Sequence, residues 1–322
     1  MEDSYPLRMR PLTVLSFVAL ATSVFADENV RHVGPVTGID VNGDVVYSCS
    51  QAGVFGSDAK TKALERVVEP GFRIFDIVAV GDDQLAMSGG IPGKSGSVAL
   101  ADLPSGKLTE HEFTKDLVYS LALSPSRKLL AAACANGEVV LIGLPLDTSK
   151  LPAKIHRHTA AARTVAVSPD GRYVASGGLD GVVLLTPIDG SGSIAGETRV
   201  LQEHTAGVEC LTFSPDGKRF ASGACDSKVR LHSIDGRLIR TYAGIGMENE
   251  PAAERVPARL WAVAWGKEQL VAGTSKGTLY RLSQTDDTWT RLESSAVGSI
   301  YALAFDSDGS LWIGSESSVI LK

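Results

Sequence analysis

The sequence predicts an all-β fold, a seven-bladed β-propeller of four-stranded antiparallel blades. One apolar reference position recurs seven times along the 322 residues, with separations of 39, 43, 44, 46, 52 and 40. The positions two and five residues before it are also apolar in all seven units. Glycine is abundant (33 copies) and aromatic residues make up only 6% of the chain, which favours many short strands with tight turns. The reference residues are Val41, Val80, Leu123, Val167, Phe213, Trp265 and Phe305.

The first 26 residues predict a secretory signal peptide. Arg8 and Arg10 are followed by an uncharged stretch over residues 11–26, which ends in Val24-Phe25-Ala26. Translation from Met1 and from Met9 both fit this pattern. The stretch is shorter than the ~20 apolar residues that cross a bilayer, so we expect no membrane span after cleavage, with a retained anchor as the alternative. We therefore expect an exported protein, periplasmic or secreted, in which residues 27–322 form a single propeller domain.

The last repeat unit leaves room for only about three strands before the C-terminus. Residues 28–33 precede the first unit much as residues 198–204 precede the fifth unit. We expect this mature N-terminal strand to complete the seventh blade and close the ring, because closure removes a free sheet edge.

The best-defined unit runs from Glu203 to Ser233 and has three apolar runs separated by a Ser-Pro-Asp-Gly turn and by Asp226-Ser227. With the preceding unit it resembles the WD-repeat (WD40-like) β-propeller family, and the repeat columns extend this resemblance over the whole mature chain. The resemblance implies His, Ser and Asp residues that are hydrogen-bonded within each blade. The repeat columns, the residues at the central channel and the lack of a catalytic constellation predict a non-catalytic protein-interaction scaffold. These structural residues are His158, Ser176 and Asp180 in one unit and His204, Ser222 and Asp226 in the next. The Trp-Asp pair of the family is replaced by Thr186-Pro187 and by His232-Ser233.

A glycine-rich segment, residues 88–95, ends in Gly-Lys-Ser. A phosphate-binding loop would need a glycine in place of Ser88 and a following helix, whereas residues 96–100 predict a strand. The segment also resembles one in exported bacterial WD-repeat proteins that are paired with c-type cytochrome modules. No Cys-x-x-Cys-His haem motif is present, so a cytochrome partner would be a separate chain.

The candidate binding surface is the column four residues before each reference position, where each innermost strand begins at the central channel. Tyr, Trp and Arg dominate this column, and they are the residues enriched at interface hot spots. We expect the surface to bind a protein partner, the alternatives being a mixed open rim and a small-molecule or metal site. Its residues are Thr37, Asp76, Tyr119, Arg163, Glu209, Trp261 and Tyr301. The Gly-rich turn and an acidic loop over residues 244–257, with Glu248, Glu250 and Glu254, are expected on the same face.

The sequence offers little chemistry for catalysis. It lacks a Gly-x-Ser-x-Gly motif, and its six histidines lie at repeat-equivalent positions. We expect no enzyme, no cofactor and no metal. The alternative is a channel-centred propeller enzyme, a lactonase-like hydrolase or an oxidoreductase accessory, that uses Asp76 and Glu209. A net charge of −6 without a basic stripe argues against nucleic acid as a partner, and we expect a monomer.

The four cysteines, Cys49, Cys134, Cys210 and Cys225, lie in or just after strands of three sequence units. An exported protein can form disulfides. The hairpin around Ser214-Pro215-Asp216-Gly217 is predicted to pair Cys210 with Ser222 rather than with Cys225, so we expect free, mostly buried thiols.

Overall fold

The computed structural model describes residues 29–32, 34–58, 64–202, 204–245, 258–283, 288–296, 298–316 and 318–321. The described residues form seven four-stranded antiparallel sheets, which are the blades of a propeller. The number of blades therefore equals the number of repeat units in the sequence. The expected signal peptide, residues 1–26, lies outside the described residues.

The strands follow the chain from the centre of the ring outward. Blade 1 consists of β2 (Gly38–Asn42), β3 (Val45–Ser50), β4 (Gly53–Asp58) and β5 (Leu64–Val68). Blade 2 consists of β6 (Arg73–Ala79), β7 (Gln84–Ile91), β8 (Ser95–Asp102) and β9 (Lys107–Thr114). Blade 3 consists of β10 (Val118–Leu123), β11 (Leu129–Cys134), β12 (Glu138–Gly143) and β13 (Ala153–Arg157). Blade 4 consists of β14 (Ala162–Val167), β15 (Tyr173–Gly178), β16 (Val182–Pro187) and β17 (Arg199–Gln202).

The remaining three blades continue this order. Blade 5 consists of β18 (Val208–Phe213), β19 (Arg219–Ala224), β20 (Val229–Ser233) and β21 (Leu238–Tyr242). Blade 6 consists of β22 (Leu260–Trp265), β23 (Leu270–Thr274), β24 (Leu279–Leu282) and β25 (Trp289–Leu292). Blade 7 consists of β26 (Ala302–Phe305), β27 (Leu311–Gly314), β28 (Ser318–Leu321) and, from the other end of the chain, β1 (Asn29–Arg31).

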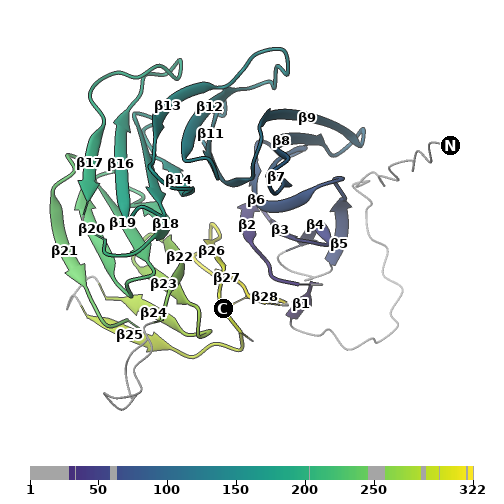
Figure 1. The fold of residues 1–322 in the computed structure, drawn as a ribbon. Helices are drawn as coiled ribbons and strands as arrows, with labels where there is room; N and C mark the ends of the chain where they lie inside the picture. The colour runs from purple at the N-terminus through teal and green to yellow at the C-terminus, as the bar shows by residue number, and fades with distance from the viewer. Residues whose placement is uncertain are drawn as a thin grey trace, which may run out of the picture.

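The ring is closed at blade 7. Strand β1 pairs antiparallel with β28, with Val30 opposite Val319. Each innermost strand contacts the innermost strand of the next blade, and β26 contacts β2. Figure 1 shows this circle, with the colour passing from purple blade 1 through teal and green to yellow blade 7, where the C-terminus lies near β1. The expected N-terminal closing strand is present as β1, although it is shorter than residues 28–33.

The core lies between neighbouring blades. One apolar residue at the start of each innermost strand is buried, and in four blades it packs against a glycine in the second strand of the preceding blade. A Cβ at Gly177 would lie 2.4 Å from Cγ1 of Val208, and one at Gly273 would lie 2.5 Å from Cγ2 of Ile300. The same contact joins Gly223 with Leu260 and Gly314 with Val36. Glycine is required there because the neighbouring blade fills the space of a side chain.

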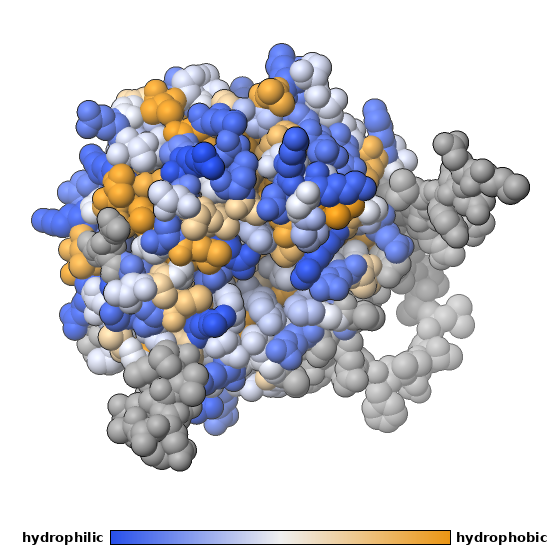
Figure 2. Space-filling model, viewed as in Figure 1, coloured by the Kyte–Doolittle hydropathy of each residue, from blue (hydrophilic) through white to orange (hydrophobic). Residues whose placement is uncertain are grey.

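The surface carries hydrophobic side chains in small groups between polar ones, as the face in Figure 2 shows. The most exposed large apolar side chains are Leu151 (82%) and Val200 (63%), which lie on different blades. The part of the chain that is described contains no helix long and apolar enough to cross a membrane.

Candidate functional site

Five of the seven innermost strands have a β-bulge near their start. In blades 2 to 6 the pairing register shifts around one residue, so that this residue has no partner on the second strand. In blades 1 and 7 the backbone N–H groups of Thr37 and Tyr301 bond to the carbonyls of Cys49 and Gly314. A bulge re-aims a side chain relative to the sheet, and here it turns the side chain toward the channel. The bulge also corrects the predicted cysteine register, because Cys210 lies opposite Gly223 rather than Ser222.

The prediction for the second unit was wrong by a single position. The bulged residue of blade 2 is Phe75, between the paired residues Ile74 and Asp76. Val80, the expected reference residue, lies one position beyond the end of β6, so Ala79 takes its place. The ring of equivalent residues is therefore Thr37, Phe75, Tyr119, Arg163, Glu209, Trp261 and Tyr301. We call this ring the channel mouth.

All seven channel-mouth residues line one cavity of about 240 Å³. Asp76 also lines it, together with small residues at the position after the bulge, such as Ser120, Thr164 and Cys210. Every residue named from the sequence for the binding surface thus lies around one space. Four of the seven mouth residues are aromatic, one more than the sequence predicted.

Asp76 binds backbone groups rather than presenting a free carboxylate. Its Oδ1 accepts a hydrogen bond from the N–H of Ile77 and its Oδ2 accepts one from the N–H of Leu121 in blade 3, both at 2.9 Å. Burial raises the pKa of Asp76 to about 7, while these bonds lower it. Asp40 has the same role in the preceding blade, because its Oδ2 accepts a 2.6 Å bond from the N–H of Ala79. Sequence analysis missed Asp40, since nothing in its spacing distinguishes it.

Glu209 is paired inside the mouth. Its Oε2 accepts a 2.8 Å bond from Nε of Arg163, and its Oε1 lies 3.6 Å from the thiol of Cys225, which donates to it. The Glu209 side chain is 6% exposed and that of Arg163 is 28% exposed. Both carboxylates of the alternative enzyme hypothesis therefore already have donors on both oxygens. Among the described residues, no group of three or more His, Cys, Asp or Glu side chains could hold a metal ion.

The aromatic side chains of the mouth are held by stacking. The guanidinium of Arg163 lies 4.2 Å from the ring centroid of Tyr119, which packs edge-on against Phe75 at 5.2 Å. Trp261 and Tyr301 lie beside each other with centroids 6.1 Å apart. Two arginines that the sequence analysis did not single out, Arg73 and Arg259, stack on Phe75 and Trp261. Their position two residues before an aromatic ring residue is the signal that could have identified them.

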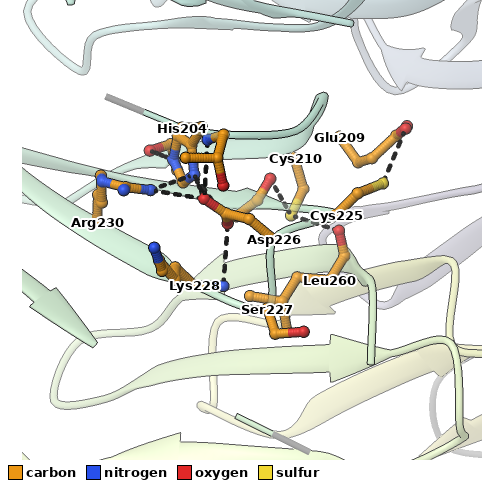
Figure 3. A network of polar contacts seen from close by, with 12 residues as sticks. His204, Glu209, Cys210, Cys225, Asp226, Ser227, Lys228, Arg230 and Leu260 are labelled. Atoms are coloured by element: carbon orange, nitrogen blue, oxygen red, sulfur yellow. Dashed lines mark hydrogen bonds and ion pairs between the residues drawn. The ribbon is translucent and has the colours of Figure 1, made fainter. Parts of the chain in front are cut away.

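The cysteines are free, and Cys49, Cys134 and Cys210 are buried. The thiol of Cys210 donates to the carbonyls of Gly223 and Leu260, which ties blade 5 to blade 6 (Figure 3). Burial raises the pKa of Cys49 and Cys134 to about 12. Burial and the Glu209 carboxylate raise the pKa of Cys225 to about 11, so all of these thiols are protonated near neutral pH.

The predicted His, Ser and Asp residues form hydrogen-bonded sets inside blades 4 and 5. His204 bonds through Nε2 to Ser222 Oγ at 2.9 Å and through Nδ1 to Asp226 Oδ1 at 3.1 Å. Arg230 pairs with the same carboxylate at 3.1 Å, as Figure 3 shows. In blade 4 His158 makes the matching bonds to Ser176 (2.8 Å) and Asp180 (3.1 Å). Because these groups are buried and bonded to each other, they stabilise the blades and do not face the channel.

In blade 4, Thr186 stands at the position of the family's tryptophan, and a histidine from β13 bonds to it. Nε2 of His156 bonds to Ser176 Oγ and Nδ1 bonds to Thr186 Oγ1, both at 2.7 Å. Burial lowers the pKa of His156 to about 3, so the ring is neutral. In blade 1, His32 bonds to Ser48 at 2.9 Å. The sequence predicted a structural role for all six histidines, and His32 lies four residues before Val36 as His158 and His204 lie four residues before Ala162 and Val208. It did not predict the bonding partners of His32 and His156.

The glycine-rich segment is mostly strand rather than loop. Strands β7 and β8 pair as far as Ile91 and Ser95, so that only residues 92–94 form the turn. A Cβ at Gly89 would lie 2.0 Å from the carbonyl oxygen of Arg73, and one at Gly96 would lie 1.8 Å from that of Asp116. The hairpin therefore packs on the two segments that lead into the innermost strands of blades 2 and 3, on the side of the channel mouth. Of the expected acidic loop, residues 246–257 with all three glutamates lie outside the described residues.

Comparisons with known proteins agree with this architecture. The family model of the WD domain, G-beta repeat, matches residues 103–142, 149–185 and 196–233, and that of the two component regulator propeller matches residues 294–317. Each WD match runs from the outermost strand of one blade through the third strand of the next.

One curated relative and one solved structure extend the comparison. A segment of 130 residues is 28% identical to cilia- and flagella-associated protein 337 B of Tetrahymena thermophila, covering 40% of this chain and 10% of that protein. The chain thus spans about a tenth of that relative's length. A chain in the crystal structure of a mitotic checkpoint complex is similar with a TM-score of 0.72, over 95% of this chain and 99% of that chain, at 17% identity. At that identity the likeness shows the fold alone.

Proposed function

Because the chain belongs to the WD-repeat β-propeller family, we propose that it is a non-catalytic scaffold that binds a protein partner at the channel mouth. WD-repeat propellers generally bind protein partners. The observation that carries the proposal for this site is that all seven channel-mouth side chains, four of them aromatic, line one cavity. Aromatic and arginine side chains offer large contact area with few rotatable bonds, which suits them to a binding hot spot.

The proposal also covers the compartment in which the protein acts and the kind of protein that it binds. We propose that the protein is exported by its leader, acts as a monomer in the periplasm or outside the cell, and binds a separate protein that carries c-type haem. The leader pattern in residues 1–26 and the glycine-rich segment support this proposal. A cytochrome fraction is therefore the first source in which to seek the partner.

The test is capture of the partner by the immobilised chain from the native exported fraction. We expect the double variant Trp261→Ala and Tyr301→Ala to lose capture, because it removes two adjacent rings of the mouth. Thermal unfolding of the variant should stay close to that of the wild type, since both side chains are partly exposed. Bound proteins are identified by mass spectrometry and haem by its absorption.

The matched control replaces two exposed apolar residues of an outermost strand, Leu238→Ala and Ile239→Ala in β21, which are 39% and 47% exposed. Capture should survive this change. If the mouth variant and the control capture the partner equally well, the mouth is not the binding surface. If the wild-type chain captures nothing specific, the scaffold proposal itself is wrong.

A further inference from the structure

Three arginines lie over aromatic rings of the channel mouth at cation–π distance, one each from blades 2, 4 and 6. Arg73 lies 4.7 Å from the centroid of Phe75, Arg163 lies 4.2 Å from that of Tyr119, and Arg259 lies 5.8 Å from that of Trp261. A stacked guanidinium keeps its N–H groups in the plane of the cation, so its edge stays available for hydrogen bonds. The three rings that line the cavity thus each have a cation beside them.

Two of these cations lack a carboxylate partner in the part of the chain that the structure describes. Arg73 and Arg259 are exposed and have no ion-pair partner among the described residues. Arg163 uses its Nε for Glu209, and no bond from its terminal nitrogens to a described carboxylate is present. An arginine edge recognises a carboxylate with two parallel N–H bonds, and a planar, pre-oriented guanidinium loses little freedom when it does so.

Four described carboxylates near the mouth accept hydrogen bonds from other groups of the protein. Glu209 is paired with Arg163, and Asp76 accepts two backbone bonds at a raised pKa. Asp116 accepts from the N–H groups of Gly93 and Leu117, and Glu316 accepts from that of Ser299. Among the described residues, Arg73 and Arg259 are therefore the mouth arginines that have no ion-pair partner, although the whole chain carries −6.

We infer that the partner enters the channel mouth with an acidic segment, whose aspartate or glutamate carboxylates bind the edges of Arg73 and Arg259. This inference rests on the proposed function, because it names the chemistry of the partner at that same site. Apolar atoms of the segment pack on Trp261 and Tyr301, while its carboxylates reach Arg259 beside Trp261 and Arg73 beside Phe75. The charge complementarity also speeds the encounter, which makes binding sensitive to salt.

The test measures fluorescence anisotropy of labelled peptides added to the wild-type chain. The probes are an octaglutamate with one central phenylalanine, the same peptide with glutamine in place of glutamate, and an octathymidylate as a polyanion without carboxylates. We expect the acidic peptide to bind, and the double variant Arg73→Gln and Arg259→Gln to weaken it by about tenfold or more. Arg73→Lys with Arg259→Lys keeps the charges but loses the forked geometry, and should recover only a fraction of the affinity.

The matched control is Arg219→Gln. Arg219 stacks on Trp265 at 5.2 Å, at the opposite end of the innermost strand, and its loss should leave peptide binding unchanged. Raising the salt from about 50 mM to about 300 mM should weaken binding of the wild type more than that of the Arg73/Arg259 variant.

Three outcomes would overturn the inference: no binding of the acidic peptide, equal binding of the glutamine peptide or the oligonucleotide, or an unaffected Arg73/Arg259 variant. The proposed function is judged separately by capture of the natural partner. If the wild type and the Arg73/Arg259 variant capture the natural partner equally well, the inference of an acidic segment is wrong and the scaffold proposal stands.

Discussion

Asp40 and Asp76 tie three successive blades together through backbone N–H groups. Burial raises the pKa of Asp40 to about 6 and that of Asp76 to about 7, and the two charges also oppose each other. Hydrogen bonds from backbone N–H groups lower both pKa values, and Arg127 further lowers that of Asp40. The usual value for an aspartate is 3.8, so the folded protein holds more protons than the unfolded chain between these limits.

It follows that these two groups make the free energy of unfolding fall as the pH rises. Their stabilisation is fully present below about pH 4 and is lost as the pH rises through about 6 to 7. We expect Asp76→Asn, which cannot ionise, to reduce the difference in unfolding free energy between pH 5 and pH 8 by on the order of 2 kcal/mol. Denaturant unfolding of both proteins at the two pH values measures this difference.

Asp216→Asn serves as the control for that measurement. The hydroxyl of Ser214 and the N–H of Lys218 lower the pKa of the Asp216 carboxyl, so it titrates below the tested range. This variant should keep the wild-type pH dependence. An Asp76→Asn protein with the wild-type dependence would show that Asp76 is ionised throughout.

The roles of residues were predictable from the sequence where the same spacing occurs in more than one repeat unit. They were not predictable where a contact occurs in one unit alone. His158 and His204 share their distances to Ser and Asp, and the structure contains both sets of bonds. His156 reaches Ser176 from the outermost strand of the previous blade, a contact that no spacing within one unit reveals. Asp76 was predicted in place of Phe75 because Ile74-Phe75, Ile77-Val78 and Ala79-Val80 are all apolar pairs, so the apolar columns fit either of two registers in this unit.

At the scale of elements, the hairpin of β7 and β8 depends on glycines that contact backbone. Gly96 lies so close to the carbonyl of Asp116 that a Cβ would meet it at 1.8 Å. A backbone carbonyl cannot turn aside as a flexible side chain can, so a larger residue must move the hairpin.

We expect Gly96→Ala to lower the free energy of unfolding by about 1–3 kcal/mol, through the displacement of the hairpin from the segment before β10. Thermal and denaturant unfolding measure the loss. Gly143→Ala is the control, because Gly143 has nothing within 4 Å of the added Cβ and no positive φ. Equal stability of the two variants would mean that the hairpin tolerates the shift.

The sequence predicted this hairpin as an extended turn, and the reason for the difference is physical. Glycine-rich segments usually break strands, but here the ladder continues through Gly89 and Gly90 to Ile91. The strand pairing continues through these glycines because neighbouring backbone segments approach them closely. These contacts exist only in the folded chain, so the local sequence does not reveal them. The repeat columns, by contrast, were sufficient for the number of blades because each unit must bury the same faces.

For the whole molecule, closure of the ring depends on three residues at the start of the described chain. Asn29, Val30 and Arg31 pair with Ile320, Val319 and Ser318. Without β1, strand β28 would be an open edge, and His32 would lose its anchorage beside Ser48.

We expect a chain that begins at His32 to be less stable than one that begins at Asp27, by about 2–3 kcal/mol for the lost ladder bonds. It should also aggregate more readily, because the edge of β28 is exposed. Guanidinium unfolding gives the first quantity and light scattering the second. The chain from Asp27 is the control, and identical midpoints would show that β1 contributes nothing to closure.

In blades 2 to 6, the bulge at the start of the innermost strand lies between a side chain that can vary and a buried neighbour that the fold requires. A residue without a cross-strand partner can be exchanged without disturbing the register of the sheet, whereas its buried neighbour cannot. The ring thus offers seven adjacent positions for variation on one common frame. Relatives with the same frame could acquire quite different binding preferences by substitutions at those positions alone, and a protein engineer could do the same.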